Sequence, residues 1–109
     1  MPMSKKAQPK VSKPRSHTPA PQVLARMESL GLVIKARRLQ QGIRQQELIE
    51  KLGISTVSLQ KVEAGQPGVA WGIVASITAA LGLPFDVDAL PEEELKALLS
   101  LAEERDRVR

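Results

Sequence analysis

Residues 45–64 read QQELIEKLGISTVSLQKVEA, and this stretch decides the fold. Two short helices that cross at a steep angle need apolar anchors on their facing sides and a turn residue that tolerates a positive φ. Gly53 can supply the turn, and apolar residues lie at helical spacing on both sides of it: Leu48, Ile49, Leu52, Ile54, Leu59 and Val62. The pattern predicts a helix-turn-helix. Its second helix would begin near Ser55 and expose a face of the kind that reads DNA. That face would consist of Thr56, Val57, Gln60 and Lys61.

The composition excludes several classes of protein. The chain has 109 residues and no cysteine, and its one histidine, His17, has no second ligand beside it. We therefore expect one domain with tails, no disulfide, no metal site and no cofactor. No serine or threonine has an identifiable histidine partner, and no glycine-rich loop could hold a phosphate, so we expect no catalytic residues and no enzyme.

Hydropathy and aromatic content narrow the possibilities further. No apolar run is long enough to span a membrane, and the N-terminus lacks the apolar core of a signal peptide. We therefore expect a cytoplasmic protein without membrane contact. Trp71 and Phe85 are the only aromatic residues. Their scarcity argues against the stacking platforms that hold single-stranded nucleic acid, and against most β-rich folds.

The net charge of +4 is unevenly distributed along the chain. Residues 1–25 carry five basic side chains and no acidic one, whereas residues 86–109 carry eight acidic and four basic side chains. A basic segment suits phosphate contacts, whose counterion release contributes much of the affinity for DNA. The acidic end would repel DNA, so we expect it to face a partner or a second subunit.

Helical periodicity and stop signals predict an all-α chain. The expected helices cover residues 22–41, 45–51, 55–63, 70–81 and a last segment from Pro91. Gly31 lies inside the first of them, so that helix could break near Leu30. Trp71 is expected to anchor the fourth helix in the core. The last helix has an apolar stripe at helical spacing: Leu95, Leu98, Leu99 and Ala102.

Three segments follow from this pattern. Residues 1–21 contain five prolines and few large apolar groups, and are expected to be a disordered basic tail. Residues 22–90 would form the helix-turn-helix domain, and residues 91–109 an acidic C-terminal helix. The tail could serve as a DNA-binding arm or simply as a solubilising segment.

The segment from Leu30 to about Leu90 resembles the Cro and phage-repressor type of helix-turn-helix, often called the Xre family. The matching elements are RRLQQGIRQQELIEKLGIS, TVSLQKVEAG and ITAALGLPFDVDAL. The resemblance implies a five-helix, lambda-repressor-like DNA-binding domain.

The resemblance also implies roles for particular residues. Arg38 and Glu63 match a buried ion pair that ties the first helix to the end of the recognition helix, which is a structural role. Gln45 matches a glutamine that meets a phosphate and braces the recognition helix. The positions that reach base edges are matched by Thr56, Val57 and Lys61, with Gln60 beside them.

Three positions depart from the family pattern. Ile49 replaces the usual alanine where the two helices approach most closely, which implies a wider crossing. Arg44 replaces the usual Ser or Thr cap and offers a further cation for DNA. The loop from Gln66 to Val69 lacks the basic residue often found there, leaving Lys51, Lys61 and the N-terminal tail to compensate.

These residues favour a sequence-specific transcriptional regulator, a repressor that binds a palindromic operator in double-stranded DNA as a homodimer. The last helix, or an edge that includes Phe85, Val87 and Leu90, would form the dimer contact; alternatively, these three residues close the core. A second hypothesis is an antitoxin that represses its own operon and binds a cognate toxin, which an adjacent toxin gene would support. A third is a bridging or adaptor protein that uses the fold to bind proteins and has little affinity for DNA.

Overall fold

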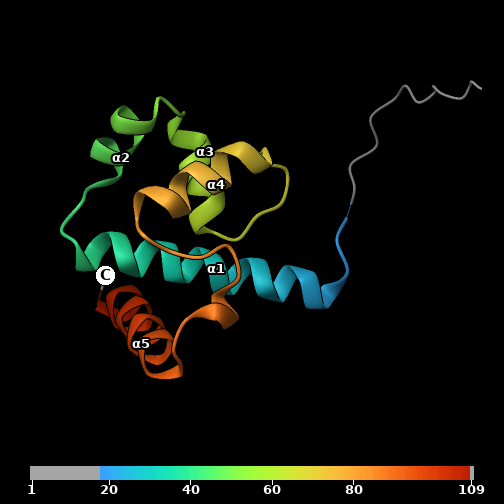
Figure 1. Ribbon diagram of the computed structural model, residues 1–109, viewed down its shortest axis with the longest axis vertical. Helices are drawn as coiled ribbons and strands as arrows, with labels where there is room; N and C mark the ends of the chain where they lie inside the picture. Colours follow the sequence, from blue (N-terminus) through green and yellow to red (C-terminus); the bar gives the residue numbers. More distant parts are fainter. Residues whose placement is uncertain (1–17, 109) are drawn as a thin grey trace, which may run out of the picture.

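The computed structural model describes residues 18–108, with side chains as far as Glu104. Within that range the chain is all-α, as predicted, and contains no strand (Figure 1). The elements are α1 (Pro21–Gln40), α2 (Gln45–Leu52), α3 (Thr56–Glu63), α4 (Trp71–Ala80), the 3-10 turn η3 (Val87–Ala89) and α5 (Glu92–Val108). His17 and residues 1–17 of the tail predicted for residues 1–21 lie outside the described residues, and Pro21, the last residue of that segment, begins α1.

Helix α1 is continuous, and the predicted break near Leu30 is wrong. Gly31 is buried in the middle of the helix, where a Cβ atom would lie 2.6 Å from the carbonyl oxygens of both Val62 and Glu63. Those carbonyls belong to the end of α3. Glycine is present here because the two backbones approach closely, not because the helix ends.

The ends of the short helices follow the local signals in the sequence. Gly53 ends α2 in the left-handed region, with φ 69°. Ser55 caps α3, as predicted, because its Oγ accepts the N–H of Ser58 at 3.0 Å. Helix α2 runs one residue further than expected, to Leu52, and α4 is one residue shorter at each end.

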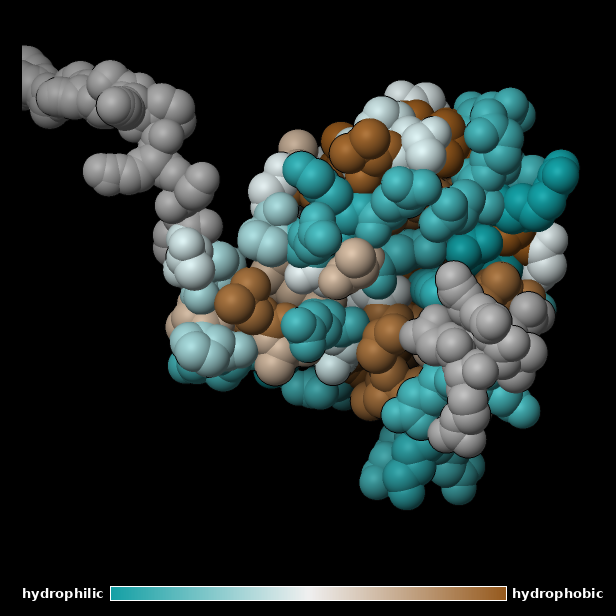
Figure 2. All heavy atoms as spheres, turned by 180° about the vertical axis from the view of Figure 1, so that it is seen from behind, coloured by the Kyte–Doolittle hydropathy of each residue, from teal (hydrophilic) through white to brown (hydrophobic). Residues whose placement is uncertain are grey.

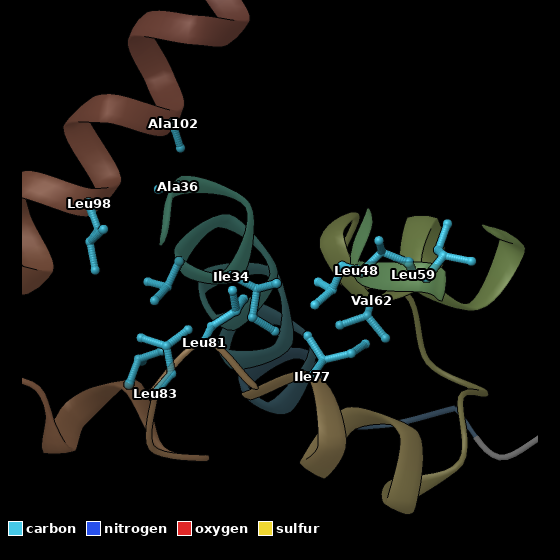
Figure 3. Packing of buried hydrophobic residues seen from close by; sticks show 13 residues of the cluster. Ile34, Ala36, Leu48, Leu59, Val62, Ile77, Leu81, Leu83, Leu98 and Ala102 are labelled. Atoms are coloured by element: carbon cyan, nitrogen blue, oxygen red, sulfur yellow. The ribbon is translucent and has the colours of Figure 1, made fainter. Parts of the chain in front are cut away.

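The core forms around α1, with α3 and α4 on one side of it and α5 on the other (Figure 1). Side chains from four helices converge there, as Figure 3 shows for Ile34, Leu48, Leu59 and Ile77. All four are almost completely buried. Burial of this kind provides most of the free energy that holds short helices together.

Helix α5 is part of this core and does not stand apart from it. Leu98 and Ala102 are fully buried, and Figure 3 shows both on the side of α5 that faces Ala36 of α1. Arg37 of α1 also forms an ion pair with Glu94 and donates to the carbonyl of Leu81. The apolar stripe of α5 is therefore used within the chain.

Trp71 is not a core anchor, and that expectation was wrong. Its side chain is 64 % exposed, and its ring contacts the half-exposed ring of Phe85, with centroids 4.8 Å apart. Trp71 is the first residue of α4, and the exposed loop before it gives no cover. Helical spacing assigned the correct face but could not indicate that this end of the face is unprotected.

Among the described residues, no helix is long and apolar enough to cross a bilayer.

Candidate nucleic-acid interface

Helix α3 exposes the four residues that the sequence assigned to its outer face. Thr56 and Val57 lie in its first turn, and Gln60 and Lys61 lie one turn later. Gln60 is four residues after Thr56, and Lys61 is four residues after Val57, so all four share one side of the helix. All four side chains are exposed. The face combines a hydroxyl, an apolar group, an amide and a cation, a set that can contact both base edges and phosphates.

The other side of α3 holds the helix in place. Leu59 and Val62 are buried in the core, and Glu63 is 8 % exposed. Helix α3 is only eight residues long. Because such a short helix is unstable alone, its orientation depends on this buried side.

Glu63 is the centre of a polar network that joins three helices. Its Oε2 accepts from Arg38 Nε of α1 at 2.7 Å, and its Oε1 accepts from Arg38 Nη2 at 3.1 Å. Gln45, the first residue of α2, donates its Nε2 to the same Oε1 at 3.0 Å. Arg38 also donates to the carbonyl of Ile43, in the turn between α1 and α2, at 2.9 Å. A two-pronged contact between a planar guanidinium and a carboxylate fixes orientation as well as distance.

Gln45 both contacts the buried network around Glu63 and is partly exposed to solvent. Its side chain is half-buried and braces the end of α3 through Glu63. An amide nitrogen carries two hydrogens, so one remains for a second acceptor while the other binds Glu63.

The start of α2 carries a charge of each sign. Arg44 precedes the helix with its side chain 80 % exposed. Glu47 accepts the backbone N–H of Arg44 at 2.7 Å, which satisfies one of the free donors at the helix start although the arginine itself cannot cap. Ile49 is buried at 9 % exposure, so the larger side chain at the α2–α3 crossing is accommodated in the core.

The remaining cations are distributed unevenly. Lys51 lines a shallow hollow together with Gly42, Ile43 and Ala80, and no residue of α3 lines that hollow. The loop at residues 66–69 carries no charged group. Seen from behind in Figure 2, the molecule is mainly hydrophilic, with hydrophobic residues in separate patches. Of the cations named for this interface, Lys61 lies on the exposed face of α3 and Arg44 is exposed at the start of α2.

Sequence reasoning placed Phe85 on a possible dimer edge but missed that Trp71 joins it at the surface. Of the three residues proposed for that edge, Phe85 is exposed, Val87 is buried and Leu90 is partly buried. The two rings are tilted by 60° and both are more than half exposed. No local signal distinguishes an aromatic residue that starts a helix in the core from one that starts it on the surface.

Comparison with known families agrees with this geometry. A family model described as a helix-turn-helix domain matches residues 29–92, which is more than half of the chain. The match begins in α1, includes α2, α3 and α4, and ends at the first residue of α5. A comparison with curated proteins gave no match.

Proposed function

Because the chain belongs to the helix-turn-helix domain family, we propose that it is a sequence-specific DNA-binding transcriptional regulator of the Cro and phage-repressor type. In this proposal it is a repressor that binds a palindromic operator as a homodimer. The observation that supports it best is the division of α3 into an exposed polar face and a buried face. A rigidly held helix with free polar side chains is what the major groove accepts.

Each exposed residue has a role in the proposal. The methyl groups of Thr56 and Val57 would meet thymine methyls, and Gln60 would pair with adenine. Lys61 would reach guanine or a phosphate. Arg44 and Gln45, at the start of α2, would contact the backbone and fix the register of the protein on the duplex.

The network around Glu63 supports these roles indirectly. Arg38 of α1 and Gln45 at the start of α2 both bind Glu63, so they hold the end of α3 against these two helices. A reading helix must keep its position to within a fraction of an ångström for hydrogen bonds to discriminate between bases. Arg38 and Glu63 therefore act on DNA only through the position of α3.

The charge on this interface predicts a moderate salt dependence. Arg44 and Lys61 supply two cations per protomer and four per dimer. If Lys61 meets a phosphate, the logarithm of the binding constant should fall with the logarithm of salt concentration with a slope of about −3.6. If Lys61 binds guanine, only the two Arg44 side chains count and the slope is about −1.8; contacts from residues 1–17 would make either slope steeper.

The test is to recover protein-bound genomic fragments at two salt concentrations. A regulator retains one or a few fragments with a shared inverted repeat at the higher concentration, because base contacts persist when phosphate contacts are screened. If no fragment survives there, the proposal fails and a protein-binding adaptor takes its place.

A substitution then tests the reading face. Lys61→Ala should lower affinity for the recovered operator by about tenfold or more, and affinity for random DNA by less. Equal losses on both DNAs would make Lys61 a phosphate contact. Lys96→Ala is the matched control, because it removes the same charge from the exposed surface of α5, across α1 from α3.

A further inference from the structure

One face of the molecule concentrates its exposed apolar side chains. Among the described residues, four large hydrophobic side chains are exposed, and three of them lie here: Val23 at 43 %, Trp71 at 64 % and Phe85 at 52 %. The fourth, Val57, lies on the exposed face of α3. We call the surface formed by Val23, Met27, Trp71 and Phe85 the aromatic face.

Two adjoining hollows give the aromatic face its shape. One has a volume of about 270 Å³ and lies between α1, the α3–α4 loop and Trp71. The second has about 240 Å³ and lies between Val23 and Phe85. Met27 and Leu30 line both hollows, so the two are continuous along α1. Contiguous apolar surface with a polar rim is typical of a protein-binding site.

No described part of the chain covers this surface. The stripe of α5 that could have done so packs on the other side of α1. Trp71 and Phe85 contact one another and remain more than half exposed. Contact between the two rings restricts the movement of both side chains, and exposed aromatic side chains contribute strongly to protein interfaces.

We propose that the aromatic face is the surface through which two copies of this chain form a dimer. The charges at its rim favour a second copy over another occupant. Arg26 lies 3.4 Å from Asp86 and 3.0 Å from Asp88, and all three side chains are more than half exposed. A two-fold interface brings the same patch of both copies together, so a patch that carries both signs of charge can pair with itself. Arg26 of one copy can then bind an aspartate of the other.

The position of the face connects the dimer to α3. The first hollow is also lined by Val62 and Gly65, at the end of α3. Contact between two aromatic faces would therefore set the separation of the two α3 helices, which must match two half-sites about one turn of DNA apart. The inference rests on the homodimer of the proposed function, and it identifies the dimer surface independently of any DNA.

The only tryptophan of the chain provides the test, since it lies in the proposed interface. The oligomeric state of the full chain is measured by sedimentation over a dilution series, and tryptophan emission is recorded on the same samples. A dimer formed through the aromatic face moves the emission to shorter wavelength as the dimer forms, because Trp71 leaves water.

Three charge substitutions make the test specific. Trp71→Glu should weaken the dimer by at least about 30-fold, as expected for loss of an aromatic hot spot. Val23→Glu, at an exposed position near the start of α1, should weaken it without removing an aromatic ring. Val57→Glu is the control, because it adds the same charge at an equally exposed apolar position outside the aromatic face. It should leave the dimer intact.

Several results would overturn the inference. A chain that remains monomeric to about 100 µM would refute a dimer formed through the aromatic face. A dimer that forms without an emission change, or that survives both Trp71→Glu and Val23→Glu, would use another surface. Emission already at short wavelength in the monomer, at every dilution, would mean that residues 1–17 of the same chain cover the ring.

Failure of the inference and failure of the proposed function can be told apart. If the chain binds a specific operator but Trp71→Glu does not weaken its dimer, the proposed function holds and the proposed interface is wrong. If Trp71→Glu breaks the dimer but the chain retains no genomic fragment, the proposed interface holds and the proposed function is wrong.

Discussion

Replacing Gly31 by alanine tests how closely α1 and α3 approach. The new Cβ atom would lie 2.6 Å from the carbonyl oxygens of Val62 and Glu63. Carbon and carbonyl oxygen normally approach to about 3.3 Å, so the two helices would have to separate by about 0.7 Å. Both contacts are with backbone atoms, which cannot rotate out of the way as a flexible side chain can.

The expected effect is a net loss of stability. Alanine gains about 1 kcal/mol over glycine inside a helix, but overpacking of this kind costs about 3 kcal/mol. The free energy of unfolding should fall by about 2 kcal/mol, which lowers the melting temperature by about 8–16 °C for a domain of this size. Thermal and urea unfolding followed by circular dichroism measure both quantities.

Gly72→Ala is the matched control. Gly72 is in the first turn of α4 and also has an ordinary negative φ, and a Cβ atom there meets nothing within 4 Å. Its replacement should therefore stabilise the protein, by up to about 1 kcal/mol. If Gly31→Ala were as stable as Gly72→Ala, the close approach of α1 to the end of α3 would be refuted.

Three further substitutions test the scaffold by urea unfolding. Arg38→Ala leaves the buried carboxylate of Glu63 without its guanidinium and should cost about 3–5 kcal/mol, and a loss below 1 kcal/mol would contradict the buried network. Ser55→Ala removes the cap of α3 and should cost about 1 kcal/mol, and an unchanged midpoint would mean that water replaces the cap. Leu98→Ala should cost about 2–5 kcal/mol if α5 belongs to the core, and a surface-like change of a few tenths would place that helix outside the cooperative unit.

The sequence predicted those features that depend on neighbours in the chain. Gly53 ends α2 and Ser55 caps α3, because a left-handed residue and a short side-chain oxygen act within one turn of the helix. The exposed residues of α3 and the buried Leu59 and Val62 also followed from helical spacing. The burial of Glu63 did not, because its partner Arg38 is 25 residues away, and only the resemblance to the Xre family implied it.

Features that depend on distant contacts were not accessible in this way. Gly31 looked like a helix breaker because the carbonyls that explain it are more than 30 residues further along the chain. Trp71 had the spacing of a core residue, but no segment of the described chain lies over that end of α4. The stripe on α5 was identified correctly, yet its pattern is the same whether the partner is α1 or another protein. Periodicity identifies an apolar face and does not identify what it meets.

The separation of roles within α3 has a consequence for redesign. The buried side chains that hold the helix in place are at positions 59, 62 and 63. The exposed side chains are at four other positions: 56, 57, 60 and 61. The outward set can therefore be randomised as a library while the framework stays constant, and variants with new base preferences can be selected from it. Such a collection would have 20 alternatives at each of four independent sites, and its members should differ little in folding yield.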